Sequence, residues 1–169
     1  MARRNAVVDT VSTVSDWPEP TAAAKRARRR KDVLTIEFRS GRSGLLDLDI
    51  PRSAVWADVL NSLREAKQPA YVEIAPDTRF ITTLLIPVAV TVASLTRTNS
   101  GDVEVELIVS HARHVLRRTN PDFRNLHKTL EAAQKSGTRL WVTETLDEHE
   151  IIDARPVPAP PPARKTRRK

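Results

Sequence analysis

The positive charge of this chain is concentrated at its two ends, which limits the part of the sequence that can build a core. Residues 1–31 contain eight Lys or Arg and three acids, and residues 156–169 contain five Lys or Arg and no acid. The net charge is +7 overall, so subtracting +5 for each end leaves −3 for the residues between them. We therefore expect a slightly acidic globular body between two basic arms.

The two basic runs are the first candidates for a nucleic-acid-binding site. The candidate residues are Lys25, Arg26, Arg28, Arg29, Arg30 and Lys31 in one run, and Arg164, Lys165, Arg167, Arg168 and Lys169 in the other. Such runs bind phosphate backbones without sequence specificity, by releasing counterions. No aromatic residue interrupts either run, so base stacking is not expected there. Binding to an acidic protein or to anionic lipid, and a role in solubility, are the alternatives.

The composition excludes several classes of site and of location. There is no cysteine, which excludes disulfides, zinc–thiolate sites and thiol nucleophiles. The most apolar stretch, residues 80–95, contains a proline and three threonines and is too short to span a membrane. Asp9 and Asp16 interrupt the N-terminal apolar residues, which is not typical of a signal peptide. We expect a soluble, cytoplasmic protein.

Residues 32–155 are predicted to form a single α+β domain, with two helices on antiparallel sheet. One helix is expected from a cap at Ser53 to Lys67, and the other from Asn120 and Pro121 to Gly137. Alternating apolar residues predict strands at 33–38, 45–50, 71–74, 80–86, 88–95, 103–109, 140–143 and 150–154.

The two ends are expected to lie outside this domain. Residues 1–31 are predicted to be a flexible basic arm. Residues 156–169 begin with five prolines in seven residues, which predicts a stiff extended spacer that ends in a basic tip.

The two halves of the body, residues 32–97 and 102–155, have similar patterns. Apolar positions of the first helix match those of the second at identical spacing: Trp56, Val59, Leu63 and Ala66 against Phe123, Leu126, Leu130 and Ala133. After a three-residue shift, the turn at Asp77 also matches the turn at Asp147. A duplicated strand–helix–hairpin unit would produce this pattern, and so would two unrelated helix-and-hairpin segments.

A few residues have the spacing of chemical sites. His111 and His114 form an H-x-x-H pair, which a helix would place on one side for a metal; a third ligand such as His149 or Glu150 cannot be placed from sequence. On a strand the two rings would point to opposite faces, and surface histidines are the alternative. Four acids, Asp147, Glu148, Glu150 and Asp153, gather in the last hairpin, where solvated acids are normal. We predict no catalytic residue, metal or cofactor.

A second basic group lies just before and inside the second helix. It comprises Arg113, Arg117, Arg118, Arg124 and Lys128. Because helix N-termini attract phosphate, this group predicts a nucleic-acid-binding surface, with a solvated charged face as the alternative. We expect a non-enzymatic binding module that engages nucleic acid or another polyanion through its basic arms. The alternative is an adaptor or structural subunit of a larger protein assembly, with tails that contact an acidic partner.

Overall fold

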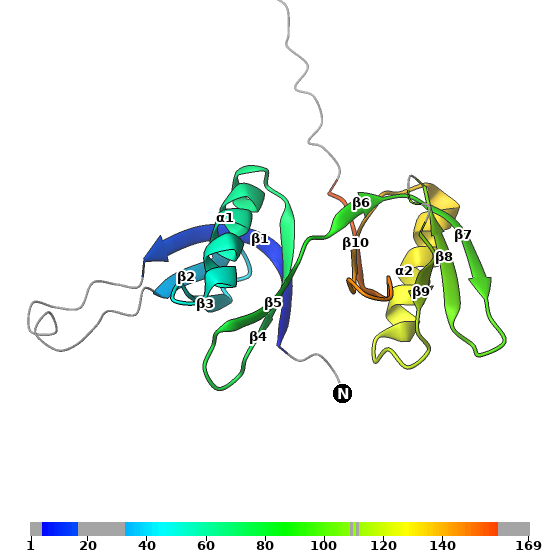
Figure 1. Cartoon of the computed structure of the whole chain (residues 1–169). Helices are drawn as coiled ribbons and strands as arrows, with labels where there is room; N and C mark the ends of the chain where they lie inside the picture. Colours follow the sequence, from blue (N-terminus) through cyan, green and yellow to red (C-terminus); the bar gives the residue numbers. More distant parts are fainter. Residues whose placement is uncertain (1–4, 17–32, 109, 111, 159–169) are drawn as a thin grey trace, which may run out of the picture. The chain divides into compact units, whose positions relative to one another are not determined.

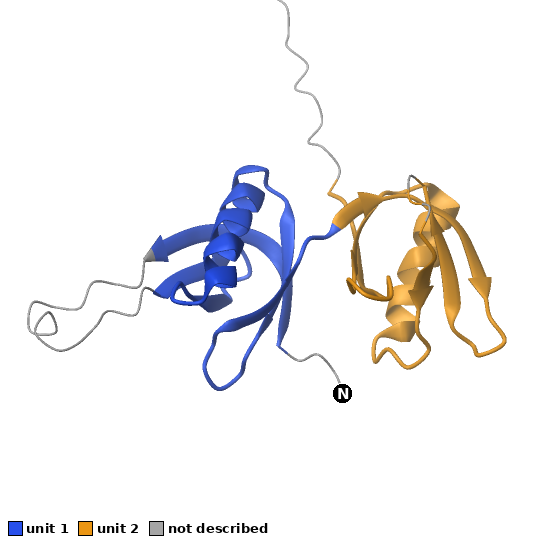
Figure 2. Cartoon of the chain, viewed as in Figure 1, with its two compact units in different colours: residues 1–87 blue, residues 88–169 orange. Residues whose placement is uncertain are grey.

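The structure, a computed structural model, describes residues 5–16, 33–108, 110 and 112–158. The chain forms two compact units, residues 1–87 (unit 1) and 88–169 (unit 2) (Figure 2). Each described unit has one helix and antiparallel strands (Figure 1), so the predicted α+β class with two helices is confirmed. Both terminal basic runs, residues 25–31 and 164–169, lie outside the described residues. Neither described helix has the length and apolarity to cross a membrane.

Unit 1 is a five-stranded antiparallel sheet with one helix. Its elements are β1 (Ala6–Asp16), β2 (Val33–Phe38), β3 (Ser43–Asp47), α1 (Pro51–Glu65), β4 (Pro69–Ile74) and β5 (Ile81–Leu85). The strand order is β3-β2-β1-β4-β5. The first part of β1 pairs with β4, and its second part pairs with β2 after an irregularity between Val11 and Thr13.

The central strand of unit 1 comes from residues that we expected in a flexible arm. Val7, Val8 and Val11 are buried, and their β-branched side chains favour a strand over a solvated tail. Residues 25–31 therefore lie in the connection between β1 and β2, instead of at the end of a free arm. The prediction of a flexible arm was wrong for residues 6–16. The net charge of residues 1–31 comes mainly from the run at residues 25–31, and it concealed the strand that precedes the run.

The two edge strands of unit 1, β3 and β5, come together at the start of β5. Leu45 forms a parallel bridge with Phe80, and the Leu45 N–H donates to the Arg79 carbonyl at 2.9 Å. The sheet thus curves toward a closed barrel. Its core joins residues of every strand to two leucines of α1; the least exposed include Ile36, Phe38, Leu46, Leu60 and Val72.

Unit 2 has the same sequence of elements, with its first strand in two pieces. They are β6 (Val88–Val90), β7 (Val92–Arg97), β8 (Val103–Leu107), β9 (His114–Leu116), α2 (Phe123–Ser136), β10 (Leu140–Glu144) and β11 (Ile151–Pro156). β6 pairs with β10, whereas β7 pairs with β8. A parallel bridge between Val115 and Glu150 brings β9 beside the start of β11. A separate core contains Leu116, Leu130 and Ile151.

The strand registers of the two units correspond residue by residue. From β3 onward, equivalent positions are 70 residues apart: Leu34 pairs with Leu46 in unit 1, and Val103 pairs with Leu116 in unit 2. The irregularity between Glu73 and Ile74 recurs between Thr143 and Glu144. Positive backbone φ angles also recur at this spacing, at Lys67 and Gly137 and at Arg79 and His149.

This register changes the helix alignment that the sequence suggested. Because β3 and β4 both correspond to their counterparts at a spacing of 70, Trp56 is equivalent to Leu126. The sequence had matched Trp56 with Phe123, three residues earlier. A shift of three residues keeps nearly the same face of a helix, so apolar spacing alone could not distinguish the two alignments. Trp56 and Phe123 are both only partly buried.

Both helices begin at residues other than the predicted caps. α1 begins at Pro51 after Ile50, and Ser53 is buried inside its first turn. α2 begins at Phe123 after Asp122. The Asn120 side chain instead accepts a hydrogen bond from the Asp122 N–H at 2.9 Å, which closes a turn before the helix. Asn120 and Pro121 therefore mark the approach to α2 and not its cap.

We predict that deleting residues 1–16 unfolds unit 1, because β1 supplies hydrogen bonds to both of its neighbours. Replacing residues 17–32 with the shorter sequence of residues 98–102 should leave unit 1 folded, since a shorter loop costs little to close. Amide hydrogen exchange read separately in the two units checks this. Retained protection of β2 and β4 in the deletion variant would contradict the central role of β1.

We also predict that Gly44→Ala destabilises unit 1 by about 1–3 kcal/mol through overpacking. Gly44 is buried, and a Cβ at this position would lie 2.8 Å from Cγ1 of the buried Ile81. Chemical denaturation measures the change, with exposed Ser40→Ala as the control. Equal stability of the two variants would show that the contact with Ile81 is not restrictive.

Candidate functional site

A pocket of about 830 Å³ in unit 2 contains two of the predicted basic residues, Arg118 and Arg124. Three segments form it: the connection between β7 and β8, the residues after β9, and the start of α2. Its lining includes Arg97, Gly101, Arg118, Asn120, Arg124 and Asn125. Asp122 also lines the pocket, so the surface is mixed but predominantly basic.

The turn between β7 and β8 positions Arg118. Thr98 and Asp102 close the turn through an N–H···O=C bond of 2.9 Å, and Gly101 adopts a φ of +84° that favours glycine. A Cβ on Gly101 would lie 3.0 Å from Arg118 Cδ, so the arginine stem passes directly over the turn. The Asp102 carboxylate accepts the Arg118 backbone N–H at 2.7 Å.

The same carboxylate is held in its charged form. The hydrogen bond from the Arg118 N–H is the main cause that lowers the pKa of Asp102; the Ser100 hydroxyl and Arg117 also lower it, and desolvation opposes them. Ser100 donates to Asp102 at 3.1 Å. The segment after β9 is thereby tied to the β7–β8 turn by an anion that stays ionised at neutral pH.

The five basic residues predicted in this region have different roles. Arg113 pairs with Glu104. Arg117 contacts Glu148 at 3.0 Å and Asp102 at 3.6 Å, and its hydrogen bond to Glu148 is the main cause that raises the Arg117 pKa. Arg118 and Arg124 line the pocket, whereas Lys128 does not. The structure thus brings together two of the five residues.

The pocket contains a third arginine that sequence analysis missed. Arg97 ends β7 and is exposed, as are Arg118 and Arg124. Among the described residues, none of these three guanidinium groups forms an ion pair. The sequence signal for Arg97 was its position directly before the turn at residues 98–102. This position points to the pocket only when β9 is known to pair with β8, because that pairing brings Arg118 beside the turn.

The N-terminus of α2 opens at the same pocket. The Asp122 side chain makes no capping hydrogen bond, and the first turn of the helix contains no acid. The first backbone N–H groups of a helix attract anions, and no capping side chain occupies them here. The pocket thus combines three exposed guanidinium groups with a positive helix end.

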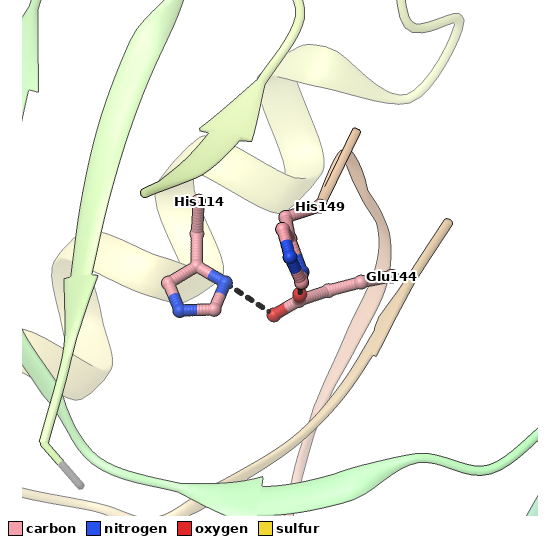
Figure 3. A group of neighbouring side chains, drawn as sticks. All are labelled: His114, Glu144 and His149. Atoms are coloured by element: carbon pink, nitrogen blue, oxygen red, sulfur yellow. Dashed lines mark hydrogen bonds and ion pairs between the residues drawn. The ribbon is translucent and has the colours of Figure 1, made fainter. Parts of the chain in front are cut away.

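A second polar cluster lies at the opposite end of β9. His114, Glu144 and His149 converge from β9, the end of β10 and the loop before β11 (Figure 3). His114 Nδ1 lies 2.7 Å from Glu144 Oε1, and His149 Nδ1 lies 3.2 Å from Glu144 Oε2. His114 is only 3% exposed, whereas the His149 side chain is 50% exposed.

The other predicted candidates do not form a site among the described residues. His111 lies outside them. Glu148 pairs with Arg117, and Asp153 with Arg155, while Asp147 is exposed. Burial is the main cause that raises the Asp153 pKa, although Arg155 opposes it. Glu150 bridges its backbone to Val115 and is not part of the histidine cluster; Glu144 is.

Comparison of this chain with protein-family models, with curated proteins and with solved structures finds no significant match.

We predict that the Arg118 amide resonance reports the titration of Asp102. The lowered pKa means that the carboxylate stabilises the fold above its unfolded pKa of about 3.9 and loses this effect as the pH falls through the folded value. The Arg118 resonance should therefore shift with a midpoint below about 3.9. In Asp102→Asn this titration should disappear. A midpoint at or above the ordinary value would contradict the proposed hydrogen bond.

Proposed function

We propose that this chain is a non-enzymatic nucleic-acid-binding protein whose unit 2 holds backbone phosphates in the arginine-lined pocket. The observation that carries the proposal is the convergence of Arg97, Arg118 and Arg124 on one pocket, with no ion-pair partner among the described residues. The basic runs at residues 25–31 and 164–169 would add contacts with neighbouring phosphates.

Guanidinium groups suit a phosphate ligand. Each planar fork can donate two parallel hydrogen bonds to one phosphate, and the α2 N-terminus adds backbone donors. Asn125 and Phe123 also line the pocket. Polar donors beside an aromatic ring are the combination that binds a sugar-phosphate backbone together with a base.

The connectivity of the two units supports the same function. When β6 and β7 are counted as one strand, each unit has five strands in the order 3-2-1-4-5, a helix between its third and fourth strands, and a parallel contact between its third strand and the start of its fifth. This is the connectivity of the OB fold, a Greek-key barrel that binds oligonucleotides through the 1–2 and 4–5 loops. This shared connectivity indicates the fold only, because one fold can host unrelated functions. The proposed function depends on the three arginines.

Basic residues lie within the 1–2 connection of unit 1, and Arg97 directly precedes that of unit 2, which itself contains no Lys or Arg. In unit 2 this connection is the turn at residues 98–102, which lines the arginine pocket. In unit 1 it is the segment between β1 and β2, which contains the run at residues 25–31. We propose that the units are copies of one ancestral barrel and that both direct this connection to the same ligand. The matching registers and positive φ angles support the duplication.

The test is binding of the full chain to labelled single-stranded DNA and RNA over a range of salt concentrations. We predict that log K falls linearly with log salt, by about 0.7 for each phosphate neutralised on a single strand. The triple variant Arg97→Ala/Arg118→Ala/Arg124→Ala should weaken binding by at least about tenfold and flatten this slope. Replacing residues 17–32 with the sequence of residues 98–102 should weaken binding further.

The matched control removes three cations outside the pocket, with Arg64→Ala, Lys67→Ala and Arg113→Ala in one chain. It should lose much less affinity than the pocket variant, although its net charge is the same. Equal losses would show that binding depends on overall charge and not on the pocket. Polyglutamate bound as tightly as DNA, with the same loss in the pocket variant, would instead favour an adaptor for an acidic protein.

A further inference from the structure

The second polar cluster of unit 2 has the composition and geometry of a metal site. Two imidazoles and one carboxylate point toward one another in Figure 3, and their candidate ligand atoms all lie within 4.8 Å of each other. Ligands that bind zinc tetrahedrally at about 2.0–2.1 Å are about 3.3 Å apart. The separation of 3.2 Å between Glu144 Oε2 and His149 Nδ1 already matches this spacing.

The buried histidine is oriented as a ligand. Its Nε2 lies 2.8 Å from the Ser110 hydroxyl, so one ring nitrogen already has an oxygen partner. Its other nitrogen, Nδ1, faces Glu144 at 2.7 Å but forms no hydrogen bond of acceptable geometry. Histidines that bind metals typically engage their second nitrogen in this way, which fixes the ring and directs the free lone pair toward the ion.

The backbone also fixes His149 at the cluster. His149 adopts a φ of +51°, and its carbonyl accepts the Val115 N–H at 3.1 Å. Because Val115 follows His114 in β9, this bond places the loop histidine next to the buried one. The two rings meet edge to face, with centroids 5.6 Å apart.

Unit 1 provides an internal comparison for this cluster. The residues at the equivalent positions are Gly44, Ile74 and Arg79, each 70 residues before its counterpart. A Cβ on Gly44 would meet Ile74 and Ile81, so apolar side chains fill the space there. Unit 1 therefore folds with the same strand register and with apolar side chains in the equivalent space. Unit 2 instead desolvates an imidazole and a carboxylate, which costs free energy unless the groups pair with each other or hold a ligand.

We propose that His114, Glu144 and His149 bind a Zn²⁺ ion in unit 2. Imidazole nitrogens with a carboxylate oxygen suit zinc, whereas magnesium and calcium prefer oxygen ligands alone. Three protein ligands leave a fourth position for water or another donor, and the half-exposed His149 places that position toward solvent. The site is separate from the arginine pocket and does not depend on nucleic-acid binding.

The test titrates the metal-free full chain with Zn²⁺ against a competing chromophoric chelator, and with Co²⁺ as a spectroscopic substitute. We expect one ion per chain, visible Co²⁺ absorption bands of a four-coordinate site, and a melting temperature that rises with zinc concentration. His149→Ala and Glu144→Gln should each weaken zinc binding by at least about tenfold. His149→Ala is the decisive variant, because its half-exposed side chain can be removed without opening the core.

The matched control is His127→Ala, which removes a partly buried histidine that contacts Glu131 on α2. It should bind zinc as the parent chain does. Absence of Co²⁺ bands, or zinc binding that is unchanged in both His149→Ala and Glu144→Gln, would overturn the proposal. The triple variant Arg97→Ala/Arg118→Ala/Arg124→Ala, which leaves all three zinc ligands in place, should bind zinc as the parent chain does, so failure of this site is distinguishable from failure of the proposed function.

Discussion

The long first strand is the element on which the architecture of each unit depends. In unit 1, β1 pairs with β4 through its first residues and with β2 through its later residues, and an irregularity near Val11 separates the two parts. In unit 2 the same change of partner falls between β6 and β7. Because one strand supplies both halves of the sheet, the sheet can curve until its edge strands meet.

This curvature places the two candidate sites. In unit 2, the β7–β8 turn comes beside the start of α2 and forms the arginine pocket. The loop before β11 reaches β9 and carries His149 to His114, and Arg117 contacts both this loop, at Glu148, and the β7–β8 turn, at Asp102. The arginine pocket depends on the pairing of the consecutive strands β7, β8 and β9, whereas the histidine cluster depends on the contact of β9 with the start of β11, which is not its neighbour in the chain.

The sequence predicted what local patterns encode. Alternating apolar residues predicted most strands, and Gly137 marked the end of α2. The repeated helix-and-hairpin pattern indicated two similar halves, but residues 88–97, which were assigned to the first half, lie in unit 2. The strand at residues 6–16 was missed because its valines lie in a segment whose net charge comes from the later basic run. β9 was missed because three residues are too few to show an alternation.

The candidate sites were predicted only in part, for a physical reason. Arg118 and Arg124 were found because they cluster in sequence, whereas Arg97 joins them only through the pairing of β7, β8 and β9. The sequence paired His114 with His111 and offered His149 or Glu150 as a third ligand, so it did not include Glu144. The true neighbour is Glu144, because the side chains of a strand alternate between faces and the loop reverses the chain after it. The spacing of 70 residues, which makes Glu144 the equivalent of Ile74 in unit 1, was the signal that could have identified it.

The basic run at residues 25–31 lies between β1 and β2, which pair with each other, and this position determines what a backbone cut there would do. The chain enters this connection from β1 and leaves it into β2, and Asp16 pairs with Leu34 at its base. A trypsin-like protease that cut at residues 25–31 would therefore sever the backbone without removing β1, which the ladders to β2 and β4 would still hold. Unit 1 would then persist as a noncovalent complex of two fragments. Its stability would depend on concentration, since the nick turns folding into an association.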